Sequence, residues 1–470
     1  MLRQRNIRII ATLGPASSSP EMIKSLFEAG ADVFRLNLSH LQPNDIKAMH
    51  TKIRDVEAQV GHPIGILADL QGPKFRVGTF RTHHAHLKAG HSFILDKDPK
   101  PGTSRRVCLP HDEIFEALEK GADILLDDGK IRLRATKVLK SRIETEIVQG
   151  GILGNRKGVN LPNAALRTEL MTDTDKASLS VLLDLGIDWV ALSFVQKAKD
   201  VEKLRKLVGD RAAIIAKIER PEALRNIEGI VKASDAVMVA RGDLGVELPV
   251  EEVPGAQKRI IDTAREHDRL VVVATQMLES MINAPVPTRA EVSDVANAIF
   301  EGADAVMLSA ESAAGEFPEE AVSVMDRVGV EIERDPHYRT FVDSVRDAPT
   351  ATRATAITAA ARHSVEVLGA SAIVTYTTSG STALRAARER PAVPIIALTP
   401  SVETARRLTL CWGLNSIDSE DATDFTDMVD KACKAVLEGK FAKKGDYIAI
   451  TAGVPFGVAG QTNVLHLAKL

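Results

Sequence analysis

The chain has 470 residues, 44% of them hydrophobic, so it can bury the cores of about two to four domains. Its 60 Lys and Arg residues nearly balance 63 Asp and Glu residues, and the formal charge of −3 argues against a nucleic-acid partner. Three widely spaced cysteines form no disulfide pattern and no apolar run is long enough to cross a bilayer, so we expect a cytoplasmic protein with no membrane partner.

Short runs of β-branched residues, each followed by a segment with helical spacing, recur along most of the chain. Such alternation predicts parallel βα units. The predicted strands span residues 7–13, 32–37, 64–69, 188–193, 212–217, 235–240, 270–274 and 304–308. Similar tripeptides, such as Gly30-Ala31-Asp32 and Gly302-Ala303-Asp304, recur where a predicted helix ends and the next strand begins. The eight units favour a closed (β/α)₈ TIM barrel over an open sheet.

Residues 71–163 separate the third and fourth predicted strands, and their residue pattern differs from that of the barrel. They contain Gly-rich turns and alternating Thr and Val residues, which predict an inserted small β-barrel lid domain. The barrel domain is thus expected to consist of a first part, residues 1–70, and a second part, residues 164–336.

A further boundary is expected near Pro336, because a new series of alternating helical and strand patterns begins after this residue. Residues 337–470 are therefore predicted to form a C-terminal α/β regulatory domain. Its expected elements are a helix over residues 352–368 and strands over residues 372–376, 394–398 and 447–451.

Polar residues follow the predicted strands at their carboxyl ends, where the loops of a parallel barrel surround one shared mouth. They are Asn37, Ser39, Asp69, Ser193, Lys217, Glu219, Asp243, Thr275, Ser309 and Glu311. Lys217 and Glu219 leave the same face of an extended segment, and Asp243 arrives from the next loop. Carboxylates without Cys or His suit a hard cation such as Mg²⁺. The alternative is an ordinary ion pair, but Gly242 and Gly245 permit close approach of a ligand to Asp243.

Several segments of the chain closely resemble pyruvate kinase, and the resemblance extends over the whole sequence in the same order. The segments are Thr12-Leu13-Gly14-Pro15-Ala16-Ser17, Arg35-Leu36-Asn37-Leu38-Ser39-His40, Lys217-Ile218-Glu219-Arg220, Ala240-Arg241-Gly242-Asp243-Leu244-Gly245, Ala274-Thr275-Gln276-Met277-Leu278-Glu279-Ser280-Met281 and Pro287-Thr288-Arg289-Ala290-Glu291-Val292-Ser293-Asp294-Val295-Ala296-Asn297. The resemblance implies transfer of the phosphoryl group of phosphoenolpyruvate to ADP, which gives pyruvate and ATP in the last step of glycolysis.

The resemblance also assigns tasks to the residues at the predicted mouth. Glu219 and Asp243 would hold Mg²⁺ or Mn²⁺, and Gly242 would approach the substrate beside them. Lys217 would neutralise negative charge on the transferring phosphoryl group and on the developing enolate. These interactions would act mainly in the transition state.

Three further residues receive roles from the same resemblance. Arg35 would pair with the phosphoryl oxygens, and Arg76 at the root of the lid would assist from the other side as the lid closes. Thr275 would contact the substrate where a proton reaches the enolate carbon. Because a threonine hydroxyl is a weak acid, we expect a chain of bound waters to act with it.

The start of the lid departs from the family pattern. After the strand-three aspartate, potassium-requiring members read Thr-Lys-Gly-Pro-Glu, whereas this chain reads Leu70-Gln71-Gly72-Pro73-Lys74. Asn37, Ser39 and Asp69 remain as candidate monovalent-cation ligands, but the Lys74 ammonium would supply the charge that K⁺ brings. We therefore hypothesise a potassium-independent enzyme; the alternative is that Lys74 only points to solvent.

A second departure lies in the loop after the second predicted strand. Leu41 stands where the family usually has glycine, directly after the Ser39-His40 pair. This change alters the loop expected near the nucleotide. No residue is therefore assigned to the base or the ribose of ADP.

A loop in the C-terminal domain combines hydroxyl groups with a glycine between a predicted strand and a predicted helix. Its residues are Thr377, Thr378, Ser379, Gly380, Ser381 and Thr382. Such a loop can cradle a phosphate group at a helix N-terminus, although Ser and Thr residues there also serve as ordinary N-caps. It matches the effector loop of the family, which implies a phosphorylated allosteric effector, either a sugar phosphate or a nucleotide monophosphate.

Two other functions share part of this pattern. A Mg²⁺-dependent barrel lyase would form an enolate with the same carboxylates, but it would need neither the lid nor Arg76 and would not use ADP. A non-catalytic sensor would keep only the effector loop, yet every residue assigned to catalysis is present. By resemblance we also expect a homotetramer.

Overall fold

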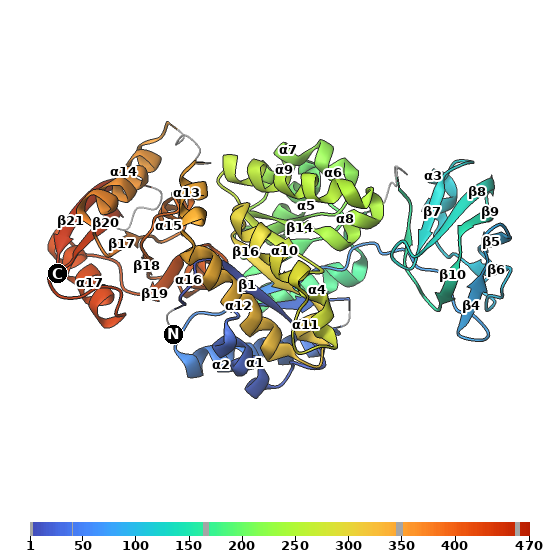
Figure 1. Ribbon diagram of the computed structural model, residues 1–470, viewed down its shortest axis with the longest axis horizontal. Helices are drawn as coiled ribbons and strands as arrows, with labels where there is room; N and C mark the ends of the chain where they lie inside the picture. The colour runs from blue at the N-terminus through green and yellow to red at the C-terminus, as the bar shows by residue number, and fades with distance from the viewer. Residues whose placement is uncertain (1–2, 40, 163–168, 345–350, 456–460) are drawn as a thin grey trace.

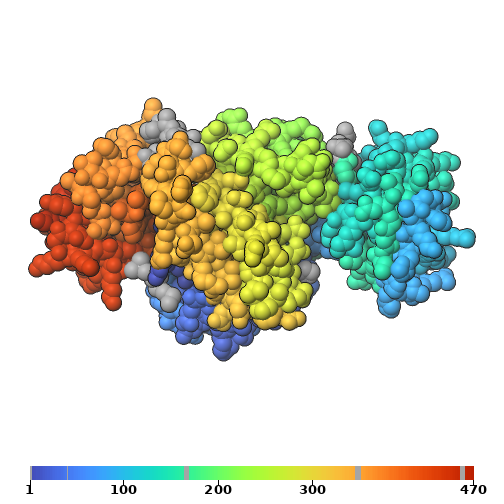
Figure 2. Space-filling view, viewed as in Figure 1, coloured from blue at the N-terminus to red at the C-terminus, as the bar shows by residue number. Residues whose placement is uncertain are grey.

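The computed structural model describes residues 3–39, 41–162, 169–344, 351–455 and 461–470. His40 lies outside these ranges, so the altered loop that contains His40 and Leu41 is described only in part. The predicted boundary between residues 163 and 164 also lies outside them. The molecule is elongated, with the barrel in the middle, the β-rich insert at one end and the C-terminal domain at the other (Figure 1). The space-filling view shows the insert as a separate lobe beside the barrel (Figure 2).

Within the described part of the chain, eight parallel strands close into a barrel in the order β1-β16-β15-β14-β13-β12-β3-β2. They are β1 (Arg8–Leu13), β2 (Val33–Asn37), β3 (Gly65–Asp69), β12 (Trp189–Leu192), β13 (Ala213–Ile218), β14 (Ala236–Ala240), β15 (Leu270–Ala274) and β16 (Ala305–Leu308). Each strand begins and ends within about one residue of its predicted range. β15 is buried at every position, which explains its uninterrupted apolar sequence. The predicted TIM barrel is confirmed.

Helices cover the outside of the barrel (Figure 1). They are α1 (Pro20–Ala29), α2 (Pro43–Val60), α4 (Asp173–Asp184), α5 (Ala198–Val208), α6 (Pro221–Arg225), α7 (Ile227–Ala233), α8 (Arg241–Glu247), α9 (Val253–Glu266), α10 (Arg289–Phe300), α11 (Ala310–Ala313) and α12 (Pro318–Arg334), with 3₁₀ turns η1 (Val250–Glu252) and η2 (Glu279–Ile282). Local sequence sets where several begin: Thr172 and Thr288 open α4 and α10 with capping boxes completed by Asp175 and Glu291. No helix among the described residues is long and apolar enough to span a bilayer.

The insert is built mainly of β-strands, as expected, but in its described residues they form two sheets and not the closed small barrel that was predicted. The strands are β4 (His84–Leu87), β5 (Ser92–Asp96), β6 (Arg106–Cys108), β7 (Asp123–Leu126), β8 (Ile131–Leu139), β9 (Arg142–Gln149), β10 (Gly151–Gly154) and β11 (Val159–Asn160), with one short helix, α3 (Asp112–Ala117). In its described residues the strands pair as a six-stranded sheet, β11-β7-β8-β9-β5-β6, and a two-stranded sheet, β10-β4. β8 begins with alternating buried and exposed residues, so the insert has an apolar core of its own.

The C-terminal domain has a five-stranded sheet, β19-β18-β17-β20-β21, in the described residues. Its elements are α14 (Arg353–Leu368), β17 (Ala372–Tyr376), α15 (Ser381–Arg388), β18 (Ile395–Thr399), α16 (Val402–Leu408), β19 (Leu414–Asp418), α17 (Phe425–Glu438), β20 (Tyr447–Gly453) and β21 (Thr462–Lys469). The preceding helix, α13 (Pro336–Ser344), packs on the barrel instead, because Tyr338 and Val342 belong to the barrel's apolar cluster. The expected helix and the three expected strands correspond to α14, β17, β18 and β20. β19 and β21 were not predicted, because both lie at sheet edges and mix polar with apolar residues.

The C-terminal domain packs against the amino ends of the barrel strands, opposite the mouth. Ile10 and Leu67 from the barrel share one buried apolar cluster with Ala383 and Leu408 of the C-terminal domain. Arg8, the first residue of β1, adds polar contacts. It donates hydrogen bonds to the backbone oxygens of Cys411, just before β19, and of Leu414, the first residue of β19. The two domains are therefore joined by a common core as well as by polar contacts.

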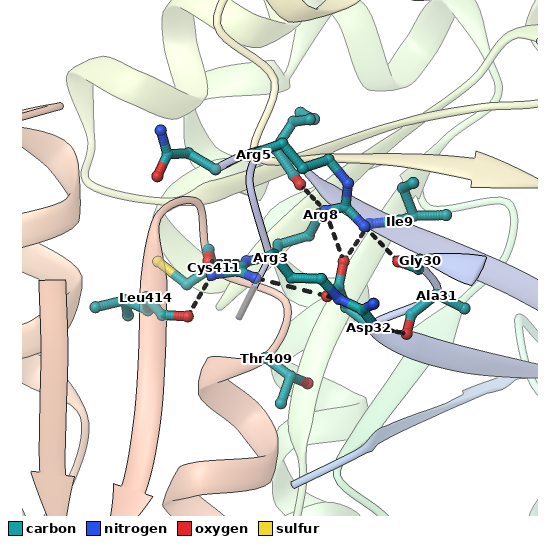
Figure 3. A network of polar contacts seen from close by, with 12 residues as sticks. Arg3, Arg5, Arg8, Ile9, Gly30, Ala31, Asp32, Thr409, Cys411 and Leu414 are labelled. Atoms are coloured by element: carbon teal, nitrogen blue, oxygen red, sulfur yellow. Dashed lines mark hydrogen bonds and ion pairs between the residues drawn. The ribbon is translucent and has the colours of Figure 1, made fainter. Parts of the chain in front are cut away.

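A buried network of charges lies at the same end of the barrel (Figure 3). Asp32 Oδ1 lies 3.0 Å from Arg3 Nε and Asp32 Oδ2 lies 2.9 Å from Arg5 Nη1. Arg8 Nη1 lies 3.5 Å from Asp32 Oδ1, and the backbone N–H of Ile9 donates to Asp32 Oδ2. One carboxylate thus holds three arginines and the start of β1 in place.

Candidate active site

Four charged residues meet at the carboxyl ends of β2, β3 and β13. Asp69 is the shared partner: its Oδ2 lies 2.7 Å from Arg35 Nη2, and its Oδ1 lies 3.2 Å from Lys217 Nζ. Lys217 Nζ also lies 2.8 Å from Glu219 Oε1. The structure therefore brings together residues that the sequence placed at one barrel mouth.

Two hydroxyl groups orient the cations of this cluster. Lys217 Nζ donates a 2.9 Å hydrogen bond to Ser193 Oγ, and Ser193 in turn donates to the backbone oxygen of Leu70. Arg35 Nη1 donates a 3.0 Å hydrogen bond to Thr12 Oγ1. Thr12 was assigned no role from the sequence, although this residue opens the first segment that resembles the family.

The charges in the cluster are unequally compensated. Burial alone would lower the pKa of Lys217, but Asp69, Glu219 and Asp243 raise it above its usual value, so the ammonium stays charged. Burial alone would raise the pKa of Asp69, but Lys217 and Arg35 hold it below its usual value. For Glu219, burial raises the pKa, Lys217 offsets this in part, and Asp243 raises it further. Three carboxylates thus share two cations.

The donor set around Glu219 fits a hard divalent cation. Glu219 is almost fully buried, and Asp243 is half-buried in the first turn of α8, directly after β14. A cation between these carboxylates would supply the positive charge that Glu219 lacks. Among the described residues, no group of three or more His, Cys, Asp or Glu side chains is arranged to hold a metal. Apart from Glu219 and Asp243, the ligands of the cation would therefore be substrate oxygens and waters, as is usual for Mg²⁺.

Thr275 lies at the end of β15 with its hydroxyl fixed by the neighbouring helix. The backbone N–H of Gly242 donates a 2.7 Å hydrogen bond to Thr275 Oγ1, which in turn donates to the backbone oxygen of Ala274. A Cβ placed on Gly242 would lie 3.4 Å from Thr275 Oγ1, an ordinary van der Waals contact, so the two residues are packed side by side. The structure thus places Thr275 beside the turn that carries Asp243.

A cavity of about 820 Å³ opens beside Arg35 and Asn37. Its wall includes Asp45 and Lys52 on α2, and Lys52 Nζ donates a hydrogen bond to the backbone of the loop before α1. Neither residue was assigned a role from the sequence, because polar residues on an amphipathic helix normally indicate only its solvent-facing side. A nucleotide-sized ligand has space here next to the charged cluster.

Of the two predicted polar residues after β16, Glu311 has a structural task. The carboxylate of Glu311 is buried and accepts hydrogen bonds from the backbone N–H groups of Leu278 (3.2 Å) and Ser309 (2.7 Å). It therefore ties the loop after β15 to the loop after β16. In the described part of the structure, neither Glu311 nor Ser309 forms a hydrogen bond or ion pair with Lys217.

Arg76 lies away from the charged cluster in this position of the insert. Its Nη1 donates a 3.0 Å hydrogen bond to the backbone oxygen of Arg156, and its backbone pairs with Gly158. The chain enters the insert at Gly72, whose φ of +67° and close approach to Phe194 leave no space for a side chain. The expected approach of Arg76 to the mouth therefore requires the insert to move.

The candidate monovalent-cation residues are only partly brought together. Asn37 and Asp69 are paired neighbours on β2 and β3, and Asn37 Oδ1 accepts a 3.2 Å hydrogen bond from the backbone of Ser39. Lys74 lies at the root of the insert, with its Cε 3.6 Å from the place where a Cβ on Gly158 would lie. Within the described ranges, no hydrogen bond or ion pair joins Lys74 to the other three residues.

The candidate effector loop connects β17 to α15 in the C-terminal domain, where Ser379 and Gly380 line a pocket shared with the barrel residues Trp189 and Arg205. Thr378 and Ser379 are exposed, whereas Thr377, Gly380 and Thr382 are buried. The hydroxyl of Thr382 is already paired with that of Thr462 at 2.7 Å. The N-cap of α15 is Gly380, with no side-chain cap, so the ordinary Ser or Thr cap considered from the sequence is absent at this position.

The comparisons with known proteins agree over the full length of the chain. A family model described as the pyruvate kinase barrel domain matches residues 4–322, and one described as the pyruvate kinase alpha/beta domain matches residues 355–468. A pyruvate kinase of Methylorubrum extorquens is 53% identical and covers 100% of this chain and 98% of its own. One of Agrobacterium vitis is 48% identical, with coverage of 99% and 97%.

A solved structure gives the same result. The crystal structure of a pyruvate kinase from Cryptosporidium parvum matches with a TM-score of 0.93 and 31% identity, covering 99% of this chain and 96% of its own. Both the barrel and the C-terminal domain are thus accounted for. The chain belongs to the pyruvate kinase family.

Proposed function

We propose that the cluster of Arg35, Asp69, Lys217, Glu219 and Asp243 is where this member of the family transfers the phosphoryl group of phosphoenolpyruvate to ADP. The observation that carries the proposal is the buried Lys217 ammonium, which shares the carboxylate of Asp69 with Arg35, and Arg35 in turn lines a cavity of about 820 Å³. Two cations held by carboxylates next to a large open space suit a phosphorylated ligand. Membership of the family argues against the lyase and the sensor.

The charged residues of the proposed site would have different roles. Lys217 and Arg35 would offset the negative charge of the transferring phosphoryl group, and Lys217 would also stabilise the enolate left behind. Asp69 would hold both cations in position. Arg76 would add a further positive charge when the insert closes over the mouth.

Glu219 and Asp243 would hold the divalent cation, Mg²⁺ or Mn²⁺, with Gly242 leaving space for the substrate. When bound, the cation polarises substrate oxygens as a Lewis acid. The near-complete burial of Glu219 and its raised pKa support this role, because both leave its charge under-compensated without a cation.

Thr275 would relay a proton from water to the enolate carbon, which completes pyruvate. Its hydroxyl is fixed by the backbone N–H of Gly242, in the same turn as Asp243. The nucleotide would occupy the cavity beside Arg35, with Lys52 near its phosphates. This arrangement would place ADP and phosphoenolpyruvate on adjacent sides of the charged cluster.

We further propose that the enzyme needs no K⁺, because Lys74 supplies the equivalent charge once the insert closes. Asn37, Ser39 and Asp69 would face this ammonium. The matched test is Lys74→Glu, which restores the acid of those relatives, with Lys88→Glu on an exposed part of the insert as control. Lys74→Glu should become K⁺-dependent, whereas Lys88→Glu should not.

Two finer assignments complete the proposal. The loop from Thr377 to Thr382 would bind the phosphate of a sugar phosphate or a nucleotide monophosphate, because Thr378 and Ser379 are exposed at its tip. The protein would assemble as a homotetramer, which light scattering after size-exclusion chromatography measures directly. In the loop from Thr377 to Thr382, replacing Ser379 with Asp should abolish activation by sugar phosphates or nucleotide monophosphates, because the added charge repels their phosphate group. The basal rate should stay unchanged.

The test of the reaction and of its potassium requirement is one experiment. Pyruvate formation from phosphoenolpyruvate, ADP and Mg²⁺ is measured in potassium-free buffer with a bulky organic cation, and again with K⁺ added. Full turnover without K⁺ is the expected result. Turnover only with K⁺ would refute the role of Lys74 and keep the reaction, whereas no turnover in either buffer would refute the assignment of the site.

A further inference from the structure

Two consecutive residues after β15 have an uncommon backbone conformation. Thr275 has a φ of 71° and Gln276 a φ of 54°, both in the left-handed region. This region is rare for residues other than glycine, and rarest for β-branched ones such as threonine. Strained backbone persists only where surrounding contacts enforce it, and it clusters at functional sites. Some group must therefore hold Thr275 in this conformation.

Arg241 is that group. Its Nη2 and Nε donate hydrogen bonds of 2.7 and 3.2 Å to the backbone oxygen of Thr275, and Nη2 lies 3.3 Å from that of Gln276. The other side of the guanidinium is anchored on α10, where Arg241 Nη1 lies 2.7 Å from Asp294 Oδ1. The side chain of Arg241 is only 11% exposed. Its planar fork therefore clamps the strained turn between α8 and α10.

The clamp fixes the turn that carries the Thr275 hydroxyl. Arg241 holds the carbonyl side of Thr275, while the next residue, Gly242, holds the hydroxyl with its backbone N–H at 2.7 Å. Both contacts come from the first turn of α8, which also carries Asp243. The distance between the hydroxyl and the proposed metal ligand is thus set by one short segment.

We propose that Arg241 is a positioning residue for protonation of the enolate. The inference rests on the role proposed for Thr275. In that step the electron pair of the enolate C=C bond forms a new C–H bond, the enolate oxygen becomes a carbonyl, and Thr275 recovers its proton from water. Arg241 touches neither substrate nor the reacting atoms; it holds the hydroxyl where the proton must be delivered.

The informative substitution is Arg241→Lys, because lysine keeps the charge and loses the planar fork that reaches two carbonyl oxygens and Asp294. The chain offers a matched control in Arg269, which also donates to two backbone carbonyls, those of Val231 and Lys232, but lies at the other end of the barrel. Arg269→Lys removes the same kind of contact without touching the mouth.

The experiment separates phosphoryl transfer from protonation in a single turnover. ATP and pyruvate are quantified after rapid quenching, and the exchange of pyruvate methyl protons with D₂O is followed by NMR in the presence of Mg²⁺ and ATP. For Arg241→Lys we expect ATP to form within about threefold of the wild-type rate, and proton exchange to fall by about 10²-fold. The solvent isotope effect on kcat should rise, whereas Arg269→Lys should match wild type in all three measurements.

Equal losses of ATP formation and proton exchange, or no loss of either, would overturn the proposal. If Arg241→Lys does not fold, Asp294→Asn weakens the same clamp from its far side and should slow proton exchange in the same direction by a smaller factor. Thr275→Val distinguishes the two proposals: unchanged proton exchange in this variant would refute the role of Thr275 itself, whereas a loss there without one in Arg241→Lys would refute only the role of Arg241.

Discussion

The two ends of the barrel each hold a buried aspartate bound by cations, but the two clusters differ in what completes them. At the amino end, Asp32 is surrounded by Arg3, Arg5 and Arg8, and these arginines also donate to backbone carbonyls (Figure 3). At the mouth, Asp69 shares Lys217 with further carboxylates, and a large cavity opens alongside. The first cluster is closed within the protein, whereas the second has unbalanced charge and open space.

The pKa directions express the same difference. At the amino end, burial alone would raise the pKa of Asp32, but Arg5, Arg3 and Arg8 hold it well below its usual range. At the mouth, the pKa of Glu219 is raised, because burial outweighs the single lysine. The pKa direction alone does not mark a catalytic site, because burial also raises the pKa of Asp188 and Asp304, which pair with arginines at the amino ends of β12 and β16. What distinguishes the mouth is that the cluster around its under-compensated carboxylate lies beside a large cavity, in keeping with the division of roles between the two ends of TIM barrels.

The largest effect on stability is expected at the amino end. Asp32→Asn leaves three buried arginines without their shared partner, so the free energy of unfolding should fall by about 3–5 kcal/mol. The rate per folded molecule should stay close to wild type, because Asp32 is remote from the mouth. Urea titration measures the first quantity. The control Asp123→Asn removes an exposed ion pair with Arg134 in the insert and should change little.

The same substitution should change the response to acid. Because the folded-state pKa of Asp32 lies below the unfolded value of about 3.9, its stabilisation is complete above that pH and is lost as pH falls toward the folded value. Wild type should therefore lose more stability than Asp32→Asn between about pH 4 and pH 2. Parallel pH profiles of the two unfolding free energies would show that the pKa of Asp32 is not depressed.

At the mouth, the corresponding substitution should affect rate more than fold. Lys217→Met removes the buried charge that faces the transferring phosphoryl group, so kcat should fall by about 10²–10³-fold. In Mg²⁺, circular dichroism should show an intact fold, because the cation takes up part of the freed carboxylate charge. Lys232→Met, at an exposed i,i+4 pair with Glu228, is the control and should retain activity. A fall in kcat below tenfold would contradict the role of Lys217.

Mg²⁺ should stabilise the protein through Glu219. At a concentration about 100 times its dissociation constant, a ligand that binds only the folded state adds about 2.7 kcal/mol. Thermal unfolding should show this gain in wild type and in Glu251→Gln, an exposed control, and lose it in Glu219→Gln. Because the pKa of Glu219 is raised, more Mg²⁺ should be needed as pH falls toward that pKa and the carboxylate takes up a proton. Equal stabilisation in both variants would assign the metal elsewhere.

The smallest effect is expected where α16 of the C-terminal domain contacts α2. Arg406 Nε donates to Glu57 Oε1 at 2.9 Å and to Oε2 at 3.1 Å, and both side chains remain partly exposed. Arg406→Met should therefore reduce the free energy of unfolding by only about 1 kcal/mol. A double-mutant cycle with Glu57→Gln measures the coupling directly, and a value near zero would leave the apolar cluster as the main link between the domains.

The barrel was predictable because each of its strands is a short buried run between turn signals. β15 shows this most clearly, since a strand covered on both faces needs apolar residues at every position. The mouth residues followed from the rule that functional groups of a parallel barrel lie at the carboxyl ends of its strands, and Asp69, Lys217 and Glu219 do meet there.

What escaped prediction depends on contacts between distant segments. The sequence cannot show that Thr12 supports Arg35, or that Asp45 and Lys52 on α2 line a cavity, because these relations arise only when β1, β2 and α2 pack. The positions of Lys74 and Arg76 relative to the mouth depend on the orientation of the whole insert. No local pattern encodes such an orientation.

The central claim is that charge at the mouth performs the chemistry while charge at the amino end supports the fold. The most direct test measures pyruvate formation from phosphoenolpyruvate, ADP and Mg²⁺ for wild type, Lys217→Met and Asp32→Asn, each normalised to its folded fraction. The account predicts a near wild-type rate for Asp32→Asn and a loss of about 10²–10³-fold for Lys217→Met. Similar rates for the two variants would contradict it.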